Sequence, residues 1–278
     1  FAFLRFAWAH GLRCLPQPLA SDPVRHLAAY AWIPGRRLLP EELTAARISE
    51  ALAFYAALNQ PRSAPAAAAL SAASEACFSL AAHVDTVERR LERLRRMPPE
   101  TEIHQQALTF VETAVWPLWR TVAAATRQRA AALGLAWEAE LPWADRRLSP
   151  SDFGYHNALL TADDHLRFID FEYAGWDDPA KLVCDFFCQP AVPVPARFWA
   201  DFVDAVVADL ADPALARNRI GLLWPVYQLK WVGLRLNEFL PVGHHRRQFS
   251  GASADRRRHQ LAQAQTALAA VAAARAPA

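Results

Sequence analysis

Helical periodicity runs through most of this 278-residue sequence and is interrupted between residues 146 and 172. There the apolar positions change from a spacing of three to four residues to the alternation typical of short strands. The run NALLTADDHLRFIDFE, residues 157–172, predicts a small hairpin with Ala162-Asp163-Asp164 at its turn. The chain is therefore expected to be a mostly helical α+β protein with a small β insertion near its middle.

Amphipathic helices are predicted on both sides of the insertion. Before it they cover about residues 41–60, 73–97 and 102–135, with a candidate kink at Pro117. After it they cover 195–210, 218–240 and the Ala-rich C-terminal end, with a polar loop over 244–259. The N-terminal end predicts a helix over 1–12 that stops at Gly11, a loop over 15–23, and a strand before Pro34-Gly35.

Composition excludes several classes of protein. Hydrophobic residues at 53% and charged residues at 21% describe a globular chain, and a formal charge of +2 gives little attraction to nucleic acid or an acidic membrane. No apolar run reaches the roughly 18 residues of a membrane span. The arginine run over 89–96 is interpreted as a solvated helix face. The four cysteines lack the paired spacing of a zinc site and are expected to be reduced thiols of a cytoplasmic protein.

Three polar residues flank the hairpin at spacings suited to phosphoryl transfer. Asp152 and Asn157 lie five residues apart in the loop SPSDFGYHN, and Asp170 follows the strand LRFI. In the kinase arrangement one Asp accepts the proton of the attacking hydroxyl, while an Asn and a second Asp hold Mg²⁺ on the nucleotide phosphates. This predicts Asp152 as the base and Asn157 and Asp170 as metal ligands. The alternative is that Asp152 and Asn157 are ordinary turn residues and Asp170 a strand-end cap.

These motifs, with the run FIDFEYAGWDDPAKLVCDF, resemble the aminoglycoside phosphotransferase and choline kinase-like family, which carries His-x-Asp-x-x-x-x-Asn and then Ile-Asp-Phe/Trp-Glu. The resemblance implies a protein kinase-like fold. Residues 1–36 would be the remnant of a β-containing N-lobe with its hinge, and residues 37–278 a mostly helical C-lobe with the catalytic and metal-binding loops. ATP and Mg²⁺ would be the cofactors, with the adenine meeting backbone groups near Ala31, Trp32 and Ile33.

Two departures from the family pattern matter. Pro150 stands where the family has His, so we expect side-chain to backbone hydrogen bonds from Ser149 or Ser151 to hold the loop. The phosphate-binding Lys, its Glu partner and the Gly-rich loop should precede the hinge. None is found there, because the only lysines are Lys181 and Lys230. We therefore expect the sequence to lack the start of its N-lobe.

Other polar residues near the motifs have more than one interpretation. Glu172 either orients metal-bound water or a substrate group, or is a solvated carboxylate at a strand end. Asp178, before Pro179, is predicted to cap a helix. The resemblance implies that Asp185 braces the catalytic loop, and His156 is expected to pack within that loop.

The sequence thus predicts an ATP- and Mg²⁺-dependent phosphotransferase that acts on a hydroxyl of a small-molecule acceptor. A sugar or amino-alcohol acceptor rests on family analogy alone. Two alternatives stay open. A pseudokinase that binds a nucleotide or a protein partner is favoured by Pro150 and the missing lysine, and a helical interaction scaffold would bind no nucleotide. The complete set of Asp152, Asn157 and Asp170 favours the enzyme. No nucleic-acid or membrane partner is predicted.

Overall fold

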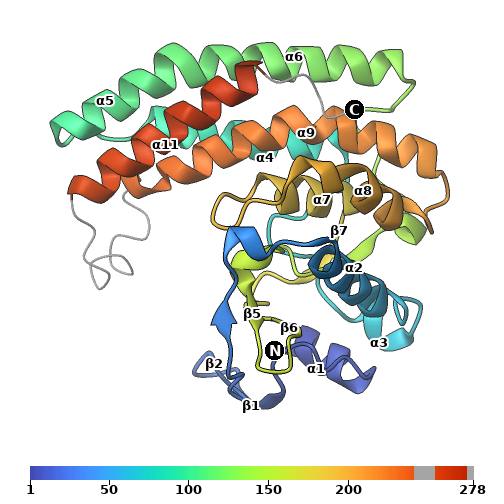
Figure 1. The fold of residues 1–278 in the computed structure, drawn as a ribbon. Coiled ribbons are helices and arrows are strands. Elements are labelled where there is room, and N and C mark those ends of the chain that lie inside the picture. The colour runs from blue at the N-terminus through green and yellow to red at the C-terminus, as the bar shows by residue number, and fades with distance from the viewer. Residues whose placement is uncertain (241–253, 274–278) are drawn as a thin grey trace. The chain divides into compact units, whose positions relative to one another are not determined.

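The computed structural model describes residues 1–240 and 254–273 (Figure 1). Contacts divide these residues into two compact units. The first unit joins residues 1–78 to residues 140–220, and the second joins residues 79–139 to the described residues after 220. Every described strand lies in the first unit, so the predicted α+β class is confirmed. The predicted lobe boundary at residue 36 falls inside the first unit and stays a prediction.

The first unit begins with a helix and a hairpin. Helix α1 (Ala2–Ala9) ends before Gly11, whose φ of 86° is the left-handed conformation expected at a helix stop. Strands β1 (Pro18–Asp22) and β2 (Leu27–Tyr30) then pair antiparallel. The prediction of a loop over 15–23 is therefore wrong for its second half. Pro18 is compatible with a strand because it stands at the first position, where its missing N–H costs no ladder bond.

The central insertion forms the predicted hairpin. Strand β5 (Ala158–Leu160) pairs with β6 (Leu166–Phe168), and β3 (Arg36–Arg37) pairs with the other edge of β5. The turn lies where it was predicted, and Asp164 takes a φ of 60° there. A second pair, β4 (Arg147–Ser149) with β7 (Gly175–Asp177), brackets the same stretch of sequence. The two strand pairs therefore bring the loop after β4 and the loop after β6 into one region.

Helices of the first unit support these strands (Figure 1). Helix α2 (Ala45–Asn59) contacts β4, β6 and α8 (Trp199–Val207), and α7 (Pro179–Cys188) contacts β4 and α8. A short helix, α3 (Pro65–Ala68), follows α2. Asp178 caps α7 as predicted, since its side chain accepts a hydrogen bond from the N–H of Ala180 at 2.7 Å. The long helix α9 (Pro213–Arg235) begins in this unit and continues in the second.

The second unit contains helices and no strand among its described residues. It contains α4 (Leu80–Arg95), α5 (Glu102–Phe110), α6 (Trp116–Ala132) and α11 (Ala254–Ala273), together with the later part of α9. Helices α5 and α6 run on from one another through a π-helical turn, Val111–Val115, directly before Pro117. This turn absorbs the helix hydrogen bond that Pro117 cannot donate, so the irregularity predicted at Pro117 is present.

Three further features differ from prediction. Helix α4 begins seven residues later than expected, because Ser79 caps it and the preceding residues pair with the segment around β7. Arg90 is buried, so the arginine-rich face of α4 is not wholly solvated. Of the predicted loop over 244–259, residues 254–259 belong to α11 and residues 244–253 lie outside the described part of the chain.

Candidate active site

The loop between β4 and β5 is held by its own serine side chains. Ser151 has a φ of 68°, in the left-handed region that non-glycine residues rarely adopt. Its N–H donates to Oγ of Ser149 at 3.0 Å, and the N–H of Asp152 donates to the carbonyl of Pro150 at 3.0 Å. The prediction that a serine holds this loop, where the resembled family has His, is therefore confirmed for Ser149.

Asp152 and Asn157 are brought together by a 3₁₀ turn, Tyr155–Asn157. Nδ2 of Asn157 donates to the backbone carbonyl of Asp152 at 3.0 Å and to its Oδ2 at 3.2 Å. Nε2 of His156 lies 3.1 Å from Oδ1 of the same carboxylate. These contacts fix the orientation of the carboxylate, and 38% of the Asp152 side chain remains exposed, so a small molecule can reach it.

Asp170 completes the predicted set. It stands two residues after β6 with a φ of 64°, and the N–H of the preceding Ile169 donates to the carbonyl of Asn157 at 2.8 Å. Burial raises the pKa of Asp170, and the nearby carboxylates of Glu172 and Asp152 raise it further. The structure thus places Asp170 close enough to Asp152 for their charges to interact. Residues held in rare backbone conformations cluster at functional sites, and Ser151 and Asp170 are two of five such non-glycine residues described.

An aromatic cluster anchors both loops. Phe153, which follows Asp152, packs against Phe54 of α2, Phe168 of β6 and Phe186 of α7 with ring centroids 5.7, 5.4 and 5.1 Å apart. All four rings are buried. Because the catalytic loop and the strand before Asp170 share this cluster, a shift of one loop disturbs the other.

The donor set suits Mg²⁺ bound together with phosphates. The side-chain nitrogen of Asn157 donates to two oxygens of Asp152. The side-chain oxygen Oδ1 of Asn157 makes no hydrogen bond among the described residues. The Asp170 residue is exposed, and the negative charges of Glu172 and Asp152 beside it disfavour its ionised form. A bound cation would offset these charges. Within the described ranges no group of three or more His, Cys, Asp and Glu side chains could hold a metal alone. Asn157 and Asp170 therefore fit a cation that takes its other ligands from phosphate and water.

The predicted hinge residues lie in the same unit, in an extended segment between β2 and β3. The N–H of Ala31 donates to the carbonyl of Gln17 at 2.9 Å, whereas the N–H groups of Trp32 and Ile33 make no hydrogen bond within the described part of the chain. Three residues after Ile33 the strand β3 begins and pairs with β5, so this segment is connected to the hairpin that follows Asn157. The Trp32 side chain is 87% exposed, so the backbone groups are the better candidates for a specific contact in this segment.

The other candidates have mixed outcomes. Glu172 is exposed and acts on Asp170 through its charge. Oδ2 of the buried Asp185 lies 3.8 Å from Nζ of Lys181, which in turn donates to Oγ of Ser151 at 3.1 Å. Lys181 therefore connects Asp185 to the loop. His156 packs over Gly154 as expected and also contacts Asp152.

Two cationic side chains beside the loop were not predicted from the sequence. Arg37 donates to the carbonyl of His156 at 2.8 Å. Lys181 was set aside because it lies far downstream of the hinge, yet it stands four residues after Asp177 and four before Asp185. That spacing places all three side chains on one face of α7 and its approach, and it was the signal that could have identified the cluster.

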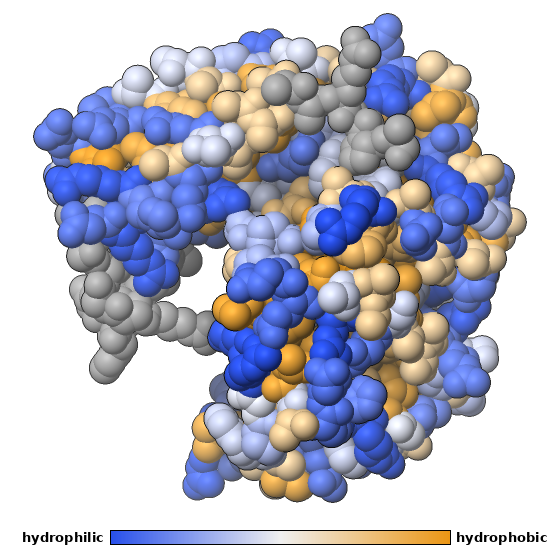
Figure 2. Space-filling view, viewed as in Figure 1, coloured by the Kyte–Doolittle hydropathy of each residue, from blue (hydrophilic) through white to orange (hydrophobic). Residues whose placement is uncertain are grey.

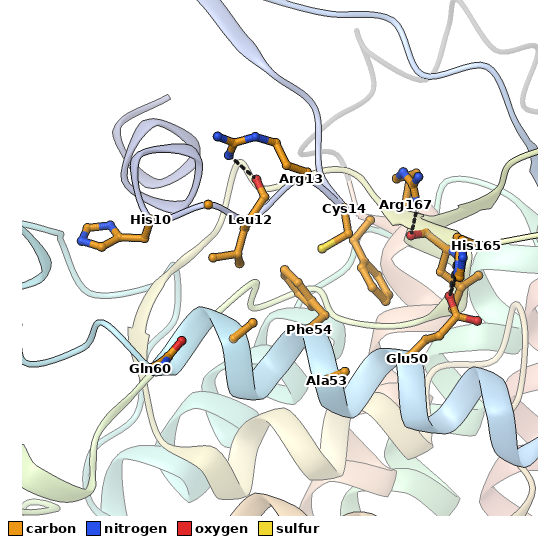
Figure 3. Close-up of a pocket in the computed structure, with 14 residues that line it drawn as sticks. His10, Leu12, Arg13, Cys14, Glu50, Ala53, Phe54, Gln60, His165 and Arg167 are labelled. Atoms are coloured by element: carbon orange, nitrogen blue, oxygen red, sulfur yellow. Dashed lines mark hydrogen bonds and ion pairs between the residues drawn. The ribbon is translucent and has the colours of Figure 1, made fainter. Parts of the chain in front are cut away.

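A cavity of about 480 Å³ lies elsewhere in the first unit (Figure 3). It is bounded by the loop after α1, the middle of α2 and strand β6, with the thiol of Cys14 and the ring of Phe54 facing it. Its lining contains none of Asp152, Asn157 and Asp170. We therefore do not assign the predicted chemistry to this cavity.

Among the residues that the structure describes, no helix is both long and apolar enough to cross a membrane. The face shown in Figure 2 mixes hydrophilic and hydrophobic residues, with hydrophilic ones covering much of it.

Comparison with known proteins identifies the fold. No family model and no curated protein matches the sequence. Three similar solved structures are a choline/ethanolamine kinase family protein from Mesorhizobium loti, the choline kinase LicA from Streptococcus pneumoniae, and the ADP-bound aminoglycoside phosphotransferase APH(2'')-Ib. Their TM-scores are 0.54, 0.55 and 0.50 at sequence identities of 19%, 13% and 14%. The matches cover 98%, 96% and 96% of this chain and 82%, 78% and 80% of the other chains. The chain has the protein kinase-like fold of these proteins, as the sequence motifs implied.

Proposed function

We propose that this protein is an ATP- and Mg²⁺-dependent phosphotransferase that moves the γ-phosphoryl group to a hydroxyl of a small molecule. The observation that carries the proposal is the convergence of Asp152, Asn157 and Asp170, which come from two loops and were assigned to this chemistry from their spacing. The fold supports it, because the similar proteins named above are called choline or ethanolamine kinases and an aminoglycoside phosphotransferase.

In this proposal Asp152 orients the acceptor and takes its proton. The acceptor oxygen attacks the γ-phosphorus while the bond from that phosphorus to the β-γ bridging oxygen breaks, and ADP leaves with the electron pair. The proton of the acceptor hydroxyl passes to the Asp152 carboxylate. The contacts from Asn157 and His156 hold that carboxylate in one orientation, which is the positioning that this reaction requires.

Asn157 and Asp170 would hold the metal and, through it, the nucleotide. A bound Mg²⁺ would neutralise charge on the phosphates. The backbone N–H groups of Trp32 and Ile33 are the proposed contacts to adenine, since they are otherwise unbonded in the described residues. One similar solved structure, APH(2'')-Ib, is described as ADP-bound, which supports a nucleotide site in this fold.

The proposed acceptor is a sugar or an amino alcohol. Two of the similar proteins are named for choline and ethanolamine, and the third for aminoglycosides, which carry both amino groups and sugar hydroxyls. These names support a small hydroxylated acceptor and leave its identity to experiment. In the same proposal, residues 1–36 belong to the N-lobe and its hinge and residues 37–278 to the C-lobe.

A two-step experiment tests the proposal. Isothermal titration with Mg·ATP, with and without EDTA, first measures metal-dependent nucleotide binding. ATP consumption is then followed over a panel containing choline, ethanolamine, simple sugars and aminoglycosides, with product phosphate located by mass spectrometry. Binding and acceptor-dependent consumption are the expected results. Binding without consumption for every acceptor would instead favour a pseudokinase, and absence of both would favour a scaffold.

A further inference from the structure

Lys181 lies in an unusual setting for a lysine. It belongs to α7 and is only 3% exposed, whereas lysines are almost never fully buried unless they are paired. Its Nζ lies 2.7 Å from Oδ2 of Asp177 and 3.8 Å from Oδ2 of Asp185, and donates to Oγ of Ser151 at 3.1 Å. Burial alone would lower the pKa of Lys181, but the charges of Asp177 and Asp185 more than offset it and raise that pKa. The two carboxylates therefore stabilise the charged form of this buried ammonium group.

One of these contacts reaches the loop that carries the proposed base. Ser151 precedes Asp152 directly and holds a φ of 68° that a serine adopts only when its surroundings impose it. Its N–H is held by Ser149, while its hydroxyl accepts from Lys181 and faces the carbonyl of Ser74 at 3.4 Å. The ammonium group of Lys181 thus contacts both Asp177, just before α7, and Ser151, the residue before Asp152.

We propose that Lys181 is a positioning residue for the catalytic loop, acting through Ser151. This inference rests on the proposed function. Because Nζ is buried and its contacts are Asp177, Asp185 and Ser151, Lys181 does not touch phosphate. It fixes the backbone of Ser151 and thereby the direction in which Asp152 presents its carboxylate. The contacts from Asp185 to Lys181 and from Lys181 to Ser151 thus connect α7 with the catalytic loop.

The chain provides a matched control for this claim. Arg219 is another buried cation that serves α7, and its Nε donates to Oδ2 of the capping residue Asp178 at 2.8 Å. Within the described residues Arg219 makes no hydrogen bond or ion pair with the loop 149–157. Arg219→Met therefore removes a buried positive charge of α9 that contacts the start of α7 but not the loop, which separates a loss of stability from a loss of positioning.

The experiment compares Lys181→Met, Ser151→Ala, the double variant and Arg219→Met in the full chain. Hydrogen–deuterium exchange of peptides covering 149–157 is the primary measurement, because it needs no catalytic activity. ATP turnover with water and with ethanolamine as acceptors, and the Kd for Mg·ATP, are measured beside it. Thermal melting records the stability of each variant.

Lys181→Met is expected to raise exchange over 149–157 and to lower kcat about 10²-fold with little change in Kd, since a misplaced catalytic group costs rate more than ground-state binding. Ser151→Ala is expected to lower kcat about tenfold, as befits one hydrogen bond to a charged group. The double variant should be no worse than Lys181→Met alone, because both changes break one link. Arg219→Met should leave exchange over 149–157 and kcat unchanged even where it lowers the melting temperature.

Three results would overturn the inference. These are unchanged exchange over 149–157 in both loop-directed variants, the same increase in Arg219→Met, or losses that multiply in the double variant. If Lys181→Met does not fold, Ser151→Ala decides alone, because it keeps the lysine paired with its carboxylates. If the wild-type protein turns over no ATP, the proposed function fails, while the exchange comparison still decides whether Lys181 positions the loop.

Discussion

Asn59 at the end of α2 is predicted to control the strand that leads into the catalytic loop. Its Oδ1 accepts from the N–H of Leu148 at 2.8 Å, and its Nδ2 donates to the carbonyls of Leu148 at 3.0 Å and Tyr55 at 3.1 Å. The amide therefore bonds the free edge of β4 as a neighbouring strand would. Asn59→Ala removes all three bonds and leaves the N–H and C=O of Leu148, a fully buried residue, without partners.

The size of the effect follows from these two orphaned groups. A buried backbone group without a partner costs about 1–3 kcal/mol, so two of them should lower the free energy of unfolding by about 3 kcal/mol. The carbonyl of Tyr55 adds little, since it sits in the helix ladder of α2. Against a typical total of about 5–15 kcal/mol this is a large fraction, and it corresponds to a fall of about 5–10 °C in Tm for a chain of this length.

Urea unfolding followed by circular dichroism measures the change. Gln60→Ala is the matched control, because Gln60 is the next residue, is exposed, and makes no side-chain hydrogen bond in the described residues; it should change the free energy of unfolding by less than about 0.5 kcal/mol. Asn59→Asp keeps the acceptor for the N–H of Leu148 but turns a buried carboxylate oxygen toward two carbonyls, so it should destabilise at least as much as Asn59→Ala. If Asn59→Ala were as stable as Gln60→Ala, the assignment of the β4 edge to this amide would be refuted.

Three further predictions test other parts of the account. In Gly175→Ala the new Cβ would overlap the carbonyl oxygen of Ser71 and lie 2.6 Å from the nitrogen of Ala73. Chemical unfolding should therefore show a free energy of unfolding that is lower by about 3 kcal/mol. Gly221→Ala, whose Cβ would meet nothing within 4 Å, should leave that free energy unchanged. Because the pKa of Asp170 is raised in the folded protein, its ionisation lowers stability as pH rises above the ordinary carboxyl range. Asp170→Asn should therefore raise Tm at pH 7 without metal and abolish the Tm increase on adding Mg·ATP. An unchanged Mg·ATP response would exclude Asp170 as a ligand. Trp32→Ala should change the Kd for Mg·ATP by less than about threefold if the contact is made by backbone groups, while a loss of more than about tenfold would show that the indole itself binds.

The local features of the site were predictable because each has a short-range cause. The hairpin follows from alternation and turn residues at 157–172, and Asp178 caps α7 because Pro179 favours the first helical position. The spacing of Asp152 and Asn157 is also local, since a single 3₁₀ turn closes it. Even the replacement for the missing loop histidine was found, because Ser149 bonds a backbone group only two residues away.

Features that depend on partners distant in sequence were not predictable. Strand β1 forms because β2 pairs with it, although the three prolines and the Ser-Asp pair of residues 15–23 favour a loop. Helix α4 begins late because residues before Ser79 bond to the segment around β7, about a hundred residues away. Lys181 was set aside as too far along the chain from the hinge, and only the fold places it against Ser151.

The central claim is that Asp152 is the base of a phosphotransferase, and Asp152→Asn tests it most directly. The amide keeps the size of the carboxylate but cannot accept the hydroxyl proton. The account predicts that kcat for ATP-dependent transfer falls by about 10²–10⁴-fold while the Kd for Mg·ATP from isothermal titration stays nearly unchanged. Turnover equal to that of the wild-type protein would contradict the assignment.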